Sequence, residues 1–184
     1  PGQRPGLDPA GKYIAILTDY HGHGTSVATV IAARGRVAYN GYGGREYRLL
    51  GVAPKAKIAG GTGWWFGDLI VAEYWLAGVD YVFDGSTLFP VIGSKRSDLI
   101  SNSWSYVNLA KWAHQAPGVD YIAALFNELV IACWNAGFNV TLVFAMGNYG
   151  PGYTTLSAQS ADLLTIGVGA STHFEYTQEL GLPP

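Results

Sequence analysis

Residues 19–35 read DYHGHGTSVATVIAARG, which sets two histidines, a Thr and a Ser around two glycines just before an apolar run. From His23 to about Ala33 the small and apolar side chains recur at helical spacing, which predicts a helix that begins at the histidine. Exposed amides at a helix start carry partial positive charge and so favour a neutral imidazole, the form that a general base needs. His23 is therefore a candidate catalytic base. A structural histidine accounts for the same local pattern.

The pair His21 and His23 also raises the question of a metal site. A third ligand at suitable spacing is missing, and a single cysteine, Cys133, excludes a multi-cysteine site. Three aspartates later in the chain form no ligand-spaced cluster with other oxygen donors: Asp80, Asp84 and Asp120. The residues alone therefore predict no metal site.

The composition bounds the class of protein. The 184 residues suit one domain, and 49% of them are apolar, enough for a sizeable core. The net charge is −2 and the basic residues are scattered, so we expect no nucleic-acid partner. No apolar stretch reaches the roughly 18 residues of a membrane span, so we expect none.

Short strand-like runs alternate with helical periodicity along the chain. Residues 1–11 read as an irregular lead-in, and 36–51 as a hairpin with a glycine-rich turn. The predicted strands are 12–18, 56–62, 98–104, 139–146 and 163–170. A helix is predicted over 69–83, with Asp68 as its cap, and another over 119–137. Alternation of this kind predicts a three-layer α/β fold, with a mainly parallel sheet covered by helices on both faces.

In such sheets functional groups gather where the strands end at their carboxyl side. Three segments would fall there: the loop before His23, SNSWS at 101–105 and GNYGPG at 147–152. We therefore expect the site at this edge of the sheet.

DYHGHGTSVATVIAA resembles the active-site histidine motif of the subtilisin-like serine proteases. Four later stretches resemble motifs of this family in the same order: GVAPKAKI at 51–58, SDLISNSWS at 97–105, LVFAMGNYG at 142–150 and LLTIGVGAST at 163–172. The resemblance covers roughly residues 12–172. It implies a subtilisin-like fold, incomplete in this chain, with residues 1–184 as part of a single peptidase domain.

The resemblance also implies roles for individual residues. His23 would be the general base, and Asn148, after Gly147, would donate to the oxyanion of a serine endopeptidase. Ser103, Trp104 and Ser105 would lie along an extended peptide substrate, as a strand adds to a sheet edge. Local alternatives are a turn at Asn148 and a buried indole at Trp104.

Two members of the catalytic triad have no counterpart in the sequence. Asp8 and Asp19 do not match the family's aspartate pattern, and GTSVA at 24–28 only imitates the serine motif G-T-S-x-A-x-P. We expect flanking segments or another chain of the same protease to supply an upstream aspartate and a downstream serine. The chain alone would then be inactive.

The resemblance further implies an extracellular or cell-surface protein, with no cofactor in the chemistry and with structural calcium as an option. The alternative is a non-catalytic module of the same fold, such as a surface-layer or binding module. A nucleotide-binding domain is disfavoured, because neither G-x-x-x-x-G-K-[ST] nor G-x-G-x-x-G occurs.

Overall fold

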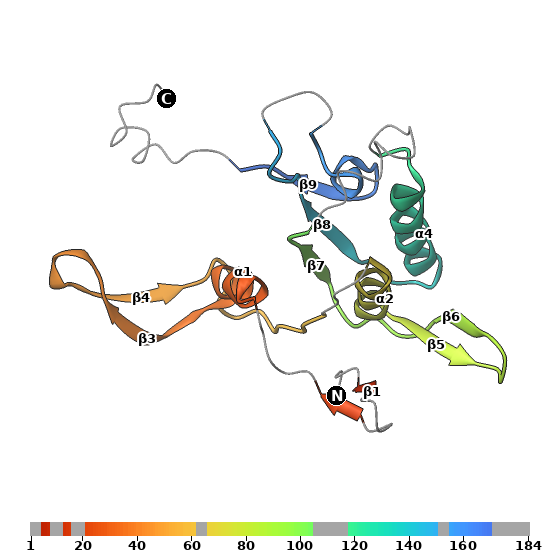
Figure 1. Cartoon of the computed structure of the whole chain (residues 1–184), viewed down its shortest axis with the longest axis horizontal. Helices are drawn as coiled ribbons and strands as arrows, with labels where there is room; N and C mark the ends of the chain where they lie inside the picture. Colours follow the sequence, from red (N-terminus) through yellow and green to blue (C-terminus); the bar gives the residue numbers. More distant parts are fainter. Residues whose placement is uncertain are drawn as a thin grey trace. The chain divides into compact units, whose positions relative to one another are not determined.

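The computed structural model of the chain describes residues 5–7, 13–15, 21–61, 66–104, 118–150 and 155–170. The chain divides into two compact units, unit 1 at Pro1–Gly60 and unit 2 at Gly61–Pro184 (Figure 1).

Unit 1 begins with two short strands and the predicted helix. Strand β1 (Pro5–Leu7) pairs antiparallel with β2 (Tyr13–Ala15), so the expectation of an irregular lead-in is wrong at β1. Helix α1 spans His23–Ala32, as the spacing predicts. None of its residues is buried, and the side chain of Val30 is 61% exposed.

The second half of unit 1 is a hairpin. Strand β3 (Arg34–Asn40), the 3-10 turn η1 (Tyr42–Gly44) and β4 (Glu46–Leu50) form the antiparallel pair that the sequence predicts. The strand predicted at 56–62 is wrong for its described residues, 56–61, which are irregular. After β4 the amides of Gly51, Val52 and Ala53 instead donate to carbonyls at the end of α1.

Unit 2 opens with helix α2 (Phe66–Ala77), which ends earlier than expected and contains Asp68 in its first turn rather than at its cap. Gly78, with φ 127°, donates to the carbonyls of Tyr74 and Trp75 and closes the helix. The apolar run 69–83 continues beyond Gly78 as a strand, because this part of the chain pairs with a second strand. Strand β5 (Val79–Phe83) and β6 (Leu88–Ile92) form an antiparallel hairpin.

A parallel sheet of three strands forms the centre of unit 2. Its order is β7 (Leu99–Asn102), β8 (Thr141–Ala145) and β9 (Ile166–Val168). Helix α4 (Tyr121–Asn135) connects β7 to β8, as expected for a parallel crossover. The carboxylate of Asp120 accepts hydrogen bonds from the amides of Ile122 and Ala123 and so starts α4. The α/β fold class is confirmed.

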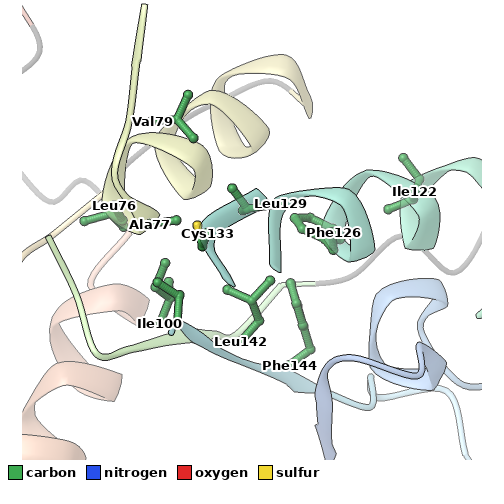
Figure 2. Close-up of a cluster of buried hydrophobic side chains, with 11 residues drawn as sticks. Leu76, Ala77, Val79, Ile100, Ile122, Phe126, Leu129, Cys133, Leu142 and Phe144 are labelled. Carbon is green, nitrogen blue, oxygen red and sulfur yellow. The ribbon is translucent and has the colours of Figure 1, made fainter. Parts of the chain in front are cut away.

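The core of unit 2 lies between one face of the sheet and two helices. Figure 2 shows side chains of α4, α2 and alternate sheet residues directed toward one another. They include Phe126 and Leu129 of α4, Leu76 of α2, and Leu142 and Phe144 of β8. The opposite face is open within the described residues, since Leu99, Ile166 and Val168 are all more than half exposed. A helix layer on that second face stays a prediction.

Within the described residues, the helices are too short or too polar to cross a membrane.

Candidate functional site

Two of the expected site segments leave the sheet side by side. Strands β7 and β8 run parallel, and Asn102 at the end of β7 is in register with Phe144. The segment that starts at Ser103 therefore emerges beside the segment that leads from Ala145 to Asn148. This places residues 101–104 and 147–150, the described parts of SNSWS and GNYGPG, at neighbouring carboxyl ends, as the sequence predicts.

A pocket of about 180 Å³ lies at these strand ends. Its lining combines serine side chains with apolar ones: Ser101, Asn102, Ser103, Val143, Phe144, Ala145 and Val168. Ser101 is in register with Val143, and Ala145 with Val168, so these residues belong to the face that α4 leaves open. The pocket can hold an apolar side chain beside two hydroxyl groups.

The side chain of Trp104 is held on the covered face of the sheet. Its ring lies edge-on to Phe144 with centroids 5.4 Å apart, and 6.1 Å from the ring of Phe126. Its carbonyl oxygen accepts a hydrogen bond of 3.0 Å from Nε2 of Gln159, which is fully buried. The indole is therefore an anchor inside the fold, and contacts with a peptide would come from the main chain of the segment that begins at Ser103.

A buried polar chain behind Trp104 escaped the sequence analysis. Nε1 of Trp104 donates to Oδ1 of Asn102 at 2.9 Å, and Nδ2 of Asn102 donates to Oε1 of Glu73 at 2.8 Å. Burial raises the pKa of Glu73 to about 7, and the Asn102 hydrogen bond offsets part of that rise. The available signal was one carboxylate in the otherwise apolar run 69–77, LIVAEYWLA.

The turn that follows β8 carries the predicted oxyanion residue. Gly147 has φ 97°, a conformation that favours glycine. Two hydrogen bonds from Ser157 hold the backbone before Gly147. The Ser157 hydroxyl donates to the Ala145 carbonyl at 2.8 Å, and the Ser157 amide donates to the Met146 carbonyl at 3.0 Å. Asn148 is exposed and makes no hydrogen bond within the described residues. Its carboxamide can therefore donate to a ligand.

His23 begins α1 in unit 1, and its side chain is exposed. Its ring lies 6.0 Å from that of His21, with the two planes at 71°. The N-cap residue is Gly22, with φ 78°, and a Cβ at Gly22 or Gly24 would meet nothing within 4 Å. The imidazole is therefore accessible to another chain, whereas its approach to Asn148 stays a prediction.

Three residues weighed in the sequence lie outside the described residues: Asp8, Asp19 and Ser105. Their roles are untested.

No group of three metal-ligating side chains forms among the residues that the structure describes. The three aspartates considered above have other partners. Asp80 pairs with Arg96, and Asp120 starts α4. Hydrogen bonds from the amides of Thr87 and Ser86 hold the pKa of Asp84 below its usual range. Structural calcium stays an option that the family resemblance implies, with no site identified in the described part of the chain.

In a comparison with protein families, the model of the subtilase family matches residues 8–179. That range contains His23, Asn148 and the other motifs quoted above. Comparison with curated proteins and with solved structures gave no significant match.

Proposed function

The chain belongs to the subtilase family, and from this premise we propose that it supplies the base and the oxyanion donor of a serine endopeptidase. Family membership supports a serine-protease-type function in general, with polypeptides as substrates. The observation that carries the finer proposal is the parallel pairing of β7 with β8. It brings the segment from Ser103 beside the turn that bears Asn148.

In the proposed reaction, His23 takes the proton of a serine hydroxyl as its oxygen attacks the peptide carbonyl carbon. The carbonyl oxygen becomes an oxyanion, to which the carboxamide of Asn148 donates a hydrogen bond. The imidazolium then gives the proton to the leaving amine as the carbon–nitrogen bond breaks. No residue of this sequence matches the family's serine or aspartate motif, so the proposal assigns both to another segment of the protease or to another chain.

The substrate would bind as an added strand. An extended peptide that pairs with the segment 103–105 gains main-chain hydrogen bonds, while a side pocket selects among side chains. The pocket beside Ser101 and Ser103 is apolar on its Val143 side, which favours a small or medium apolar side chain. Gly147, lacking a Cβ, would let the peptide carbonyl approach Asn148.

We also propose that the protease works outside the cell or at its surface, without a cofactor in the chemistry. Activity that stayed inside washed cells, with none at the surface or in the medium, would contradict this location. Retention of full activity and thermal stability after chelation would contradict a structural calcium ion.

The catalytic proposal is tested with variants of a form of the protein that carries the nucleophile, assayed on a fluorogenic peptide. Asn148→Ala should lower kcat about 10²–10³-fold, the size known for the oxyanion asparagine of a subtilisin. His23→Ala should cost more, because it removes the proton acceptor in every turnover. Asn135→Ala, at the exposed end of α4, is the matched control and should change nothing.

Undiminished turnover in the His23 variant would remove the central claim. Absence of turnover in the unsubstituted protein, with peptide binding retained, would favour the non-catalytic module instead.

A second test measures whether the two proposed groups meet. A base and an oxyanion donor that serve one tetrahedral carbon lie within roughly 8 Å of each other, because each is about 3 Å from atoms bonded to it. Nitroxide labels at Ser26→Cys and Tyr149→Cys, with Cys133→Ser, should therefore report one short, narrow distance. A long or broad distribution in the active protein would contradict the shared site.

A further inference from the structure

The carboxylate of Glu73 lies in the core of unit 2, where only 2% of the residue is exposed. Its hydrogen-bond partner among the described residues is the amide of Asn102, and no Lys or Arg of those residues is within ion-pair distance. Burying a carboxylate without a cation is unfavourable, and an apolar side chain would fill the same space without that cost. Packing alone therefore does not account for a glutamate here.

The contacts of Glu73 lead directly to the predicted peptide-binding segment. A carboxylate accepts and an indole N–H only donates, so the Asn102 amide has one orientation that satisfies both neighbours. Its Nδ2 faces Glu73 on α2, and its Oδ1 faces Trp104 after β7. The acceptor oxygen on α2 thereby fixes the rotation of an indole two residues beyond the end of the strand.

Trp104 is also held from two other elements. Its ring meets Phe126 of α4 and Phe144 of β8, and its carbonyl accepts from Gln159. Because that carbonyl is already engaged, the main-chain groups left for an incoming peptide belong to the neighbouring residues, starting with Ser103. The position of Ser103 thus depends on how Trp104 is anchored.

We propose that Glu73 is a positioning residue for peptide binding, which acts through Asn102 and Trp104 to set the backbone of the segment that begins at Ser103. The inference rests on the proposed function, because it assigns to that segment the pairing with an extended substrate. Glu73 does not touch the substrate. Its effect is on the affinity for a peptide that spans the segment.

The link from Glu73 to Trp104 can be tested on this chain by NMR. The signal to follow is the proton–nitrogen correlation peak of the Trp104 indole N–H. The peak that is missing in the Trp104→Phe variant identifies it. Glu73→Leu should shift and broaden this signal, because the Asn102 amide loses the acceptor that orients it. Glu73→Gln retains an acceptor oxygen and should keep the signal. Glu128→Leu, an exposed glutamate of α4, is the matched control. An unchanged indole signal in the Glu73→Leu variant would overturn the proposal.

The consequence for substrate is tested in the form of the protein that carries the nucleophile. Glu73→Leu should raise KM for a peptide of several residues roughly tenfold, the upper size of a lost neutral hydrogen bond, with kcat unchanged. Glu73→Gln should restore KM. If Glu73 only stabilised the fold, a Glu73→Leu variant with the wild-type melting temperature would show no rise in KM.

The outcomes separate the two proposals. A shifted indole signal with an unchanged KM would overturn the positioning role while catalysis stands. A protein that neither cleaves nor binds the peptide would overturn both, whatever the indole signal shows.

Discussion

The two units of the chain differ in what holds them together. All the apolar residues that the structure records as buried belong to unit 2, between Leu76 and Ala158. In the described part of unit 1, helix α1 buries none of its residues, and both strands of the β3–β4 hairpin are largely exposed. The proposed oxyanion donor therefore belongs to a unit with a core, and the proposed base to a unit whose described residues form none.

The difference follows from side-chain size. Helix α4 presents Phe, Leu and Ile to a sheet, whereas α1 is built from His, Gly, Thr, Ser, Val and Ala with a single Ile. Small side chains remove little apolar area from water, so they stabilise a helix weakly unless another surface covers them closely. The lesson is that the strand-end turn with Asn148 has a rigid support of its own. The histidine helix has no such cover from the described residues of unit 1.

The largest expected effect comes from deleting a ring in the core of unit 2. Phe126→Ala should lower the free energy of unfolding by about 3–5 kcal/mol, because the fully buried ring leaves a cavity against Phe144 and Trp104. Urea unfolding, followed by the circular dichroism of the helices, measures the loss.

Val30→Ala provides the counterpart in unit 1. Its side chain is 61% exposed, so the change should stay within about 0.5 kcal/mol. A loss at Val30 as large as that at Phe126 would show that α1 is covered in solution, and would erase the contrast between the units.

The next effect concerns pH and the buried carboxylate of unit 2. The pKa of Glu73 is about 7 in the folded chain, against an ordinary 4.5. Below pH 4.5 the Glu73 carboxyl is protonated in both the folded and the unfolded chain, and its contribution to the free energy of unfolding is fully present. As the pH rises, the unfolded chain releases the proton first, so the free energy of unfolding falls until the folded group ionises near 7. The total loss is about 3 kcal/mol.

Glu73→Gln separates this contribution from the rest. Burial also raises the pKa of Asp162, which adds a loss in the same direction. The difference between wild type and the Gln variant, from urea unfolding at pH about 5 and about 8, isolates Glu73. Equal slopes with pH in the two proteins would show that the Glu73 carboxyl is solvated.

Much of unit 2 was predictable from sequence because its strands and helices carry their own periodicity. The i, i+3, i+4 repeat from Ile122 to Cys133 became the buried face of α4. The division of the apolar run 69–83 into a helix and a strand was not predictable from hydrophobicity. It depends on pairing with β6, which comes later in the chain.

The candidate site divides in the same way. The adjacency of the segments at Ser103 and Asn148 followed from the rule that parallel strands end at one edge. The direction of the Trp104 indole did not, because a strand-end side chain can turn to either face. Glu73, which orients the indole's partner Asn102, lies 31 residues before Trp104, and Gln159, which binds the Trp104 carbonyl, lies 55 after it.

A smaller effect tests how the helices of the two units begin. Asp120→Ala should cost about 1 kcal/mol, because the carboxylate accepts from two amides that the helix leaves unpaired. The N-cap residue of helix α1 is Gly22, which has no side chain that could accept such bonds. Asp120→Asn keeps an acceptor and should retain most of the stability, as measured by thermal unfolding. Equal losses in both variants would assign the effect to charge rather than to capping.

The smallest effect is expected at an ion pair of the unit 1 hairpin. Glu46 and Arg48 lie 3.1 Å apart, with side chains 60% and 58% exposed. Water already solvates both charges, and holding two long side chains in one geometry costs conformational entropy, so Glu46→Gln should change the stability by less than about 1 kcal/mol. The change should vanish in high salt, since exposed pairs are screened. Hydrogen exchange at the amide of Tyr47 measures it locally, because global unfolding reports mainly on the core of unit 2. A loss of stability in Glu46→Gln that persists in high salt would mean that the ion pair is buried in solution. Another surface would then cover the hairpin of unit 1.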